Sequence, residues 1–121
     1  MASVRYIVSD IDQSVAFYRD RLGFAVEMQA GGFAALRRDD LRLLLNVPGA
    51  GSAGKAGGHP QPGGWSRFQI ETSDLDSFMQ KLREGGQVSF RGDIAEGAGG
   101  RQILLEDPSG NVIELFEAAA R

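Results

Sequence analysis

The chain repeats one short motif in its two halves. The sequence Ser-Asp-Ile-Asp at residues 9–12 returns as Ser-Asp-Leu-Asp at residues 73–76, 64 positions later. Each copy follows a run in which apolar and polar residues alternate, which predicts a β-strand with two unlike faces. After each copy the apolar spacing becomes helical. A repeat of this length in a chain of 121 residues predicts a fold built from two similar modules.

Each predicted helix has a start signal and a stop signal. Asp10 and Asp74 stand where an N-cap carboxylate accepts hydrogen bonds from the first free N–H groups, and Gln13 follows Asp10 as in a capping box. Gly23 and residues 85–86 stand where a glycine closes a helix in the left-handed conformation. We therefore interpret the two aspartates as structural residues and not as catalytic ones.

Three short strands are predicted to follow each helix. They lie near residues 24–30, 32–38 and 41–47 in the first half and near 87–91, 100–106 and 111–117 in the second. The segment 107–111 (Asp-Pro-Ser-Gly-Asn) predicts a tight turn, because proline presets one dihedral angle and glycine admits a positive one. The predicted unit is strand, helix and three strands, used twice.

Three segments of the chain resemble the vicinal oxygen chelate superfamily: residues 5–10 (RYIVSD), 17–24 (FYRDRLGF) and 106–115 (EDPSGNVIEL). That group includes glyoxalase I, bleomycin-resistance proteins, fosfomycin-resistance transferases, methylmalonyl-CoA epimerase and extradiol dioxygenases. The resemblance covers nearly the whole chain. It implies an α+β fold of two βαβββ modules that form curved, half-open mixed β-sheets. It is less specific for activity, since one scaffold hosts many chemistries.

The length predicts one domain over residues 1–121, with a first module at about 1–47 and a second at about 65–118. Between them, residues 48–64 hold seven glycines and three prolines in 17 positions, a composition that cannot offset its ordering entropy by burial. This segment is either a linker or a mobile flap over a pocket. The resemblance implies that modules pair within one chain or swap between two chains, and a homodimer in either case.

Composition excludes several other classes of protein. The formal net charge of −3 argues against a nucleic-acid footprint, which needs a basic stripe. The chain shows no apolar run of membrane-spanning length and no signal-peptide pattern at its start, so we expect no membrane partner and a cytoplasmic location. Because the chain has no cysteine, disulfides, thiolate nucleophiles and sulfur-ligated metals are excluded.

Metal-dependent members of the superfamily use four inward-facing ligands, two from each module. Aligned on the repeated aspartates, the two first-strand ligand positions fall on Ser3 and Arg67, and neither suits a catalytic divalent metal. The last-strand position of the second module falls on Glu114, which keeps the family's residue. Its counterpart in the first module falls on Arg42 or Leu43. We therefore expect no metal cofactor, with a divalent metal in a non-standard site as the alternative.

Arg67 has a further consequence, since its guanidinium places a permanent positive charge where the cation would otherwise sit. It could pair with Glu114, either to serve ligand binding or as a purely structural pair. His59 is the sole histidine, and its place in the glycine-rich segment predicts an exposed loop residue and not a metal ligand.

Strand alternation predicts which side chains face the concave side of the sheets. That set is polar for the most part, unlike an ordinary core, and comprises Ser3, Arg5, Ile7, Arg67, Gln69, Glu71 and Glu114. Phe33 and Trp65 are candidates for flat apolar walls of a ligand pocket, with module packing as the alternative role for either.

Two functions are consistent with these features. In the first, the protein sequesters or carries a small organic molecule in a dimer pocket without metal chemistry, as the bleomycin-resistance branch does, which would make it an antibiotic-resistance protein. In the second, it is a superfamily enzyme, a lyase, isomerase or dioxygenase, acting on a vicinal oxygen-containing substrate. Acid/base work by Glu114 or Glu71 belongs to the second. The replaced ligands favour the first.

Overall fold

The structure is a computed structural model that describes residues 2–50 and 59–120. The chain forms two compact units. One covers the N-terminal part of the chain up to Gly64 together with the short segment Pro108–Asn111, and the other covers Trp65–Asp107 and the chain from Val112 onward. Each unit has its own sheet and its own helix, and each is described by itself.

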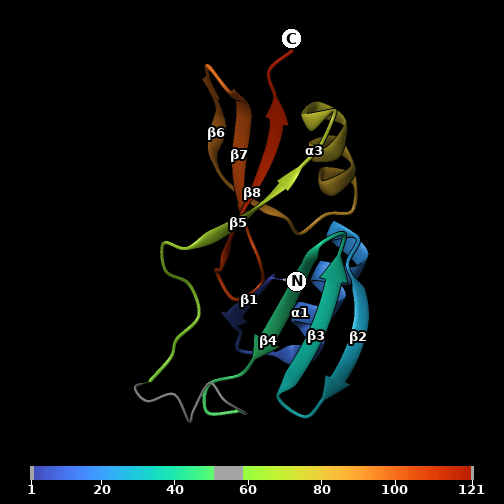
Figure 1. The fold of residues 1–121 in the computed structure, drawn as a ribbon, viewed down its shortest axis with the longest axis vertical. Helices are drawn as coiled ribbons and strands as arrows, with labels where there is room; N and C mark the ends of the chain where they lie inside the picture. Colours follow the sequence, from blue (N-terminus) through green and yellow to red (C-terminus); the bar gives the residue numbers. More distant parts are fainter. Residues whose placement is uncertain (1, 51–58, 121) are drawn as a thin grey trace. The chain divides into compact units, whose positions relative to one another are not determined.

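The first unit is a mixed four-stranded sheet with one helix (Figure 1). In chain order its elements are β1 (Ala2–Ile7), α1 (Ile11–Leu22), β2 (Ala25–Ala30), β3 (Phe33–Arg38) and β4 (Leu41–Asn46). The spatial order is β1-β4-β3-β2, in which β1 pairs in parallel with β4 and the other pairs are antiparallel. The last strand of the unit, β4, therefore returns to lie beside the first strand, β1.

The second unit has the same architecture. Its elements are β5 (Arg67–Glu71), α3 (Leu75–Glu84), β6 (Ser89–Gly97), β7 (Gly100–Glu106) and β8 (Val112–Ala118). The spatial order β5-β8-β7-β6, with β5 parallel to β8, matches that of the first sheet strand for strand. The predicted fold class, α+β with two βαβββ modules of mixed sheet, is confirmed.

Both helices begin and end as the sequence predicts. The Asp10 side chain accepts a hydrogen bond from the backbone N–H of Gln13, and the Asp74 side chain accepts one from Ser77, each at 3.0 Å. These bonds satisfy donors that an α-helix leaves free in its first turn. Gly23 closes α1 in the left-handed conformation, with a φ of 76°. The repeated aspartates are helix caps in both units.

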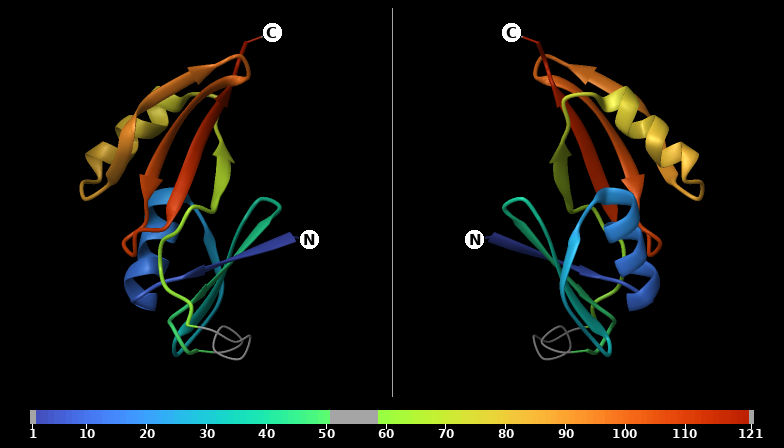
Figure 2. Two further views of the ribbon diagram at one scale, coloured as in Figure 1. Left: turned by 90° about the vertical axis from the view of Figure 1, so that its left-hand side faces the viewer. Right: turned by 90° about the vertical axis from the view of Figure 1, so that its right-hand side faces the viewer.

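Each sheet buries one face against its helix (Figure 2). In the first unit the buried side chains alternate along the strands, as with Leu43 and Leu45 of β4, and α1, which packs on this sheet, buries Val15 and Tyr18. In the second unit Phe68 and Ile70 of β5 are buried while Arg67, Gln69 and Glu71 between and beside them are exposed. Burial of this apolar stripe is the main source of stability for both units.

The strand predicted at residues 87–91 is wrong in extent, because β6 runs from Ser89 to Gly97. The pairing of β6 with β7 shifts register between Arg91 and Ala95, and Gly92 has a φ of 76°. This irregularity is a β-bulge, which lets a strand continue past a glycine that would otherwise suggest its end.

The predicted turn at residues 107–111 is present and is tied to the first unit. Asn111 is 3 % exposed, and its side-chain amide donates to the backbone oxygen of Ile7 at 2.8 Å. The amide oxygen of Asn111 accepts from the backbone N–H of Gly63, also at 2.8 Å. One buried side chain thus joins the end of β1 to the segment that precedes β5.

Within the described ranges, no helix is long and apolar enough to cross a membrane.

Candidate functional site

Each sheet has a second face, away from its helix, which we call its open face. In the second unit the open face holds Arg67, Gln69 and Glu71 of β5, and the register places Val112, Glu114 and Phe116 of β8 beside them. Beyond β8, the next strand contributes Gln102, Leu104 and Glu106. The three predicted β5 residues are all exposed, so the concave-facing set predicted for this module does lie on one face.

Arg67, Gln69 and Glu114 form one hydrogen-bonded group on this face. The Nε of Arg67 donates to Oε1 of Glu114 at 2.9 Å, and the Nε2 of Gln69 donates to Oε2 of the same carboxylate at 2.6 Å. Glu114 is 8 % exposed, whereas the Arg67 side chain is 37 % exposed. Both carboxylate oxygens are therefore engaged, one of them by a charge-assisted hydrogen bond.

A second ion pair lies farther along the same face. Arg91 of β6 and Glu106 of β7 approach to 3.3 Å, and both side chains are partly exposed. Leu104 and Phe116 are half-buried between the charged groups. This open face is thus mainly polar, with two ion pairs and, beside them, the apolar side chains of Val112, Leu104 and Phe116.

The open face of the first unit differs in character. It carries the predicted Ser3, Arg5 and Ile7 of β1, of which Ser3 and Arg5 are exposed and Ile7 is half-buried. A guanidinium nitrogen of Arg5 donates to the side-chain oxygen of Asn46, a fully buried residue at the end of β4. The Asn46 amide nitrogen in turn donates to the backbone oxygen of Ala50 at 3.4 Å. The partner of Arg5 is therefore a neutral side chain, the amide of Asn46.

The counterpart of Glu114 in the first unit is Leu44, so the sequence-based assignment to Arg42 or Leu43 is wrong. Glu114 lies opposite Gln69 in the second unit, and Arg5, the equivalent of Gln69 in the repeat, lies opposite Leu44. Leu43 faces the helix and is fully buried, and Arg42 pairs with Glu27 at 3.0 Å. The parallel pairing of β1 with β4 sets this register, and spacing along the chain does not specify it.

Apolar side chains continue the open face of the first unit across the sheet. Leu44 lies opposite Ala35 of β3, and Ala35 lies opposite Met28 of β2, which is 52 % exposed. In the neighbouring row Phe33 lies opposite Asn46 and is half-buried. Phe33 thus lies on the open face of the first unit. Trp65 precedes β5 and is 93 % exposed, so no packing role is visible for it within the second unit.

The family's four metal-ligand positions do not fit a divalent metal here. They hold a hydroxyl (Ser3), an alkyl group (Leu44), a guanidinium (Arg67) and one carboxylate (Glu114), and the carboxylate is already bonded to the guanidinium. A metal of this kind needs several oxygen or nitrogen donors free of positive charge. In the described part of the chain no three His, Cys, Asp or Glu residues gather in a way that would hold a metal ion. His59 is an exposed residue of the segment before β5.

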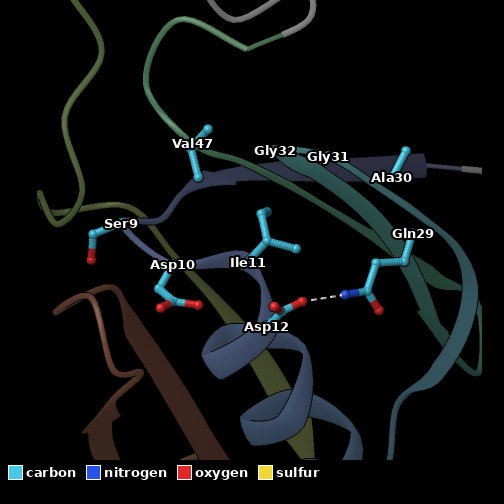
Figure 3. Close-up of a pocket in the computed structure, with 9 residues that line it drawn as sticks. All are labelled: Ser9, Asp10, Ile11, Asp12, Gln29, Ala30, Gly31, Gly32 and Val47. Atoms are coloured by element: carbon cyan, nitrogen blue, oxygen red, sulfur yellow. Dashed lines mark hydrogen bonds between the residues drawn. The ribbon is translucent and has the colours of Figure 1, made fainter.

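Two open pockets lie where the first strand of each unit gives way to its helix. The larger, of about 760 Å³, lies in the first unit between the start of α1 and the end of the β2–β3 hairpin, and Figure 3 shows its lining. Its polar groups already have partners: Asp10 caps α1, and the Asp12 carboxylate accepts a 2.7 Å hydrogen bond from Gln29. The pocket of the second unit, of about 570 Å³, includes Glu71, Thr72 and Ser73.

Sequence reasoning missed several residues of the open faces, among them Asn46, Leu44 and Met28. Asn46 was visible as a polar residue that ends the apolar run 41–46, and a buried amide in that position calls for a partner. Leu44 can be identified as the counterpart of Glu114 only from the register of β1 with β4. Met28 reaches the open face after a bulge between Val26 and Met28, which no alternation count anticipates.

Comparison with known proteins places the chain in a family. The family model for the Glyoxalase/Bleomycin resistance protein/Dioxygenase superfamily matches residues 1–115. A bleomycin resistance protein from Geobacillus stearothermophilus is 26% identical over 119 residues, covering 91% of this chain and 90% of that protein.

Solved structures agree. A superfamily member from Sphaerobacter thermophilus has a TM-score of 0.79 at 26% identity, covering 97% of this chain and 95% of that one. An antibiotic binding protein from Streptomyces sp. CB03234 has a TM-score of 0.74 at 26% identity, covering 97% and 93% of the two chains. This protein belongs to the Glyoxalase/Bleomycin resistance protein/Dioxygenase superfamily.

Proposed function

We propose that the protein binds a small organic molecule, which it sequesters or carries as a homodimer, without the metal site of metal-dependent superfamily members. The observation that carries this proposal is the bonded group of Arg67, Gln69 and Glu114, in which a guanidinium occupies the electrostatic place of a metal cation. Such a group offers hydrogen bonds to a ligand but no open coordination position.

The composition of the open faces supports binding. Binding sites for small molecules combine apolar walls with a few oriented polar groups. The first unit supplies Phe33, Leu44 and Met28 beside Arg5, and the second supplies Arg67 and Gln69 beside half-buried Leu104 and Phe116. Trp65, exposed before β5, is a further wall for a ligand or for a second copy of the chain.

The relatives support the same class of function. The curated relative from Geobacillus stearothermophilus is named a bleomycin resistance protein, and the Streptomyces structure is that of an antibiotic binding protein. An antibiotic is accordingly the ligand to try first.

The enzyme alternative has less support from the geometry. Glu114 accepts hydrogen bonds on both oxygens from Arg67 and Gln69. Both oxygens of this carboxylate are therefore already engaged within the protein, and a general base must reach the proton that it abstracts. Glu71 is an exposed residue of the same face.

The proposal is tested on protein purified without an affinity tag or chelator. Elemental analysis is expected to find well under one divalent metal per chain. Sedimentation is expected to find a dimer at micromolar concentration. Calorimetric titration with bleomycin and other aromatic antibiotics is expected to find saturable binding that added metal does not enhance. About one metal per chain together with metal-dependent turnover of a substrate would contradict the proposed metal-free binding function. A monomer in sedimentation would contradict the proposed homodimer.

A further inference from the structure

We propose that the ligand is an apolar, ring-bearing molecule with a negatively charged group, and that Arg5 is the residue that binds this group. The inference rests on the proposed function, because it names the ligand class of the same open faces. It comes from comparing the partners of the arginines on these faces.

Three arginines on the open faces are paired with carboxylates. Arg67 is bonded to Glu114 at 2.9 Å, Arg42 to Glu27 at 3.0 Å, and Arg91 lies 3.3 Å from Glu106. Each pair is locally neutral, so it offers a ligand hydrogen bonds but little net charge.

Arg5 differs from these three. Its side chain donates to the amide oxygen of Asn46, and in the described part of the chain no carboxylate lies within ion-pair distance of it. Arg37 of β3 likewise donates to a neutral group, the backbone oxygen of Asp39, but it lies opposite another arginine, Arg42. The neutral amide of Asn46 orients the guanidinium of Arg5 without cancelling its charge. Arg5 is an exposed residue. Its remaining N–H groups have the fork geometry that matches a carboxylate, sulfonate or phosphate.

The surroundings of Arg5 indicate what the rest of the ligand is. Leu44 lies directly opposite Arg5, and Phe33 lies opposite Asn46 in the next row. Met28 completes the row of Leu44 at the far edge of the sheet and is half exposed. An apolar ring system that covers these side chains would bring a charged substituent to the Arg5 end of the row. Burial beside the rings would also strengthen the ion pair by excluding water.

A matched pair of fluorescent probes separates the charge from the rings. The probe 8-anilinonaphthalene-1-sulfonate and N-phenyl-1-naphthylamine share one ring system, and only the first carries a sulfonate. The wild-type protein is expected to bind the sulfonate about tenfold more tightly than the neutral probe. Arg5→Gln is expected to lower affinity for the sulfonate by about tenfold and to change affinity for the neutral probe by less than about twofold.

Two further variants make the test specific. Arg37→Gln removes the same charge one row away, where the Nε donates to the backbone of Asp39, and it should change sulfonate affinity by less than about twofold. Asn46→Asp keeps Arg5 but gives it an acidic partner, and it should lower sulfonate affinity nearly as much as Arg5→Gln. Circular dichroism establishes that each variant is folded.

The outcomes distinguish the inference from the function on which it rests. Equal affinity for both probes, no effect of Arg5→Gln, or an equal loss in Arg37→Gln would overturn the role of Arg5 and leave ligand binding standing. If neither probe binds saturably, or if Leu44→Asp leaves the binding of both unchanged, the open face is not the binding site, and the proposed function fails with the inference.

Discussion

Arg67 and Glu114 lie on neighbouring parallel strands, and the Nε of Arg67 donates to Oε1 of Glu114 at 2.9 Å. The acid is nearly buried, while more than a third of the arginine side chain reaches solvent. The pair is therefore asymmetric. Removing the arginine leaves a buried charge, whereas removing the acid leaves a guanidinium that water can still reach.

Arg67→Ala is expected to destabilise the fold by about 1–2 kcal/mol, because Glu114 then has only Gln69 as a partner. Urea denaturation measures the free energy of unfolding. Arg91→Ala is the control, since its pair with Glu106 is more exposed on the acid side and should contribute under about 0.5 kcal/mol. Arg67→Ala should also weaken binding of a carbonyl-bearing ligand by roughly 1–3 kcal/mol. Equal losses of stability in both variants would show that burial of Glu114 does not matter.

Asp10→Ala is expected to destabilise the protein by about 0.5–2 kcal/mol, because the first turn of α1 loses an acceptor for the N–H of Gln13. Asp10→Asn retains a capping oxygen and should be nearly neutral. Neither change should alter ligand affinity if the aspartate is only a cap. Thermal unfolding and titration of the same samples provide the check, and a large loss of binding in the stable Asp10→Asn protein would assign the carboxylate a functional role.

Gly100→Ala is expected to cost about 2–4 kcal/mol. Gly100 has a φ of 148°, and a Cβ on it would lie 2.1 Å from the backbone oxygen of Glu117 on the neighbouring strand β8. Gly99→Ala is a close control, since a Cβ there meets no atom within 4 Å. Comparing the two midpoints of urea denaturation tests the prediction. Similar midpoints would mean that the end of the β7–β8 ladder can open without cost.

Asn111→Ala is expected to destabilise the protein by about 1–3 kcal/mol, because the backbone oxygen of Ile7 and the N–H of Gly63 both lose their hydrogen bond to this buried side chain. Asn111→Asp keeps the acceptor for Gly63 but loses the donor to Ile7, so it should recover only part of the loss. Hydrogen exchange at Gly63, followed by NMR, reports the same contact directly. An unchanged exchange rate in Asn111→Ala would contradict this role.

The sequence alone determined the modules, the helix limits and the outward faces. Asp10, Gly23 and Asp74 act on residues one to four positions away in the chain. Along β5, successive side chains point to opposite faces of the sheet, so Arg67 and Phe68 lie on different faces. Local effects of this kind can be inferred from neighbours in the chain. The possible pairing of Arg67 with Glu114 was also visible, because the repeat aligns both with positions that face one another in the family.

Tertiary structure decided what the repeat could not. The partner of Arg5 is Asn46 and the counterpart of Glu114 is Leu44 because β1 and β4, far apart in sequence, pair in one particular parallel register. The bulges at Met28 and Gly92 likewise depend on the strand opposite. Register is a property of two segments together, set by the burial of a whole face against a helix, so a single stretch of sequence does not contain it.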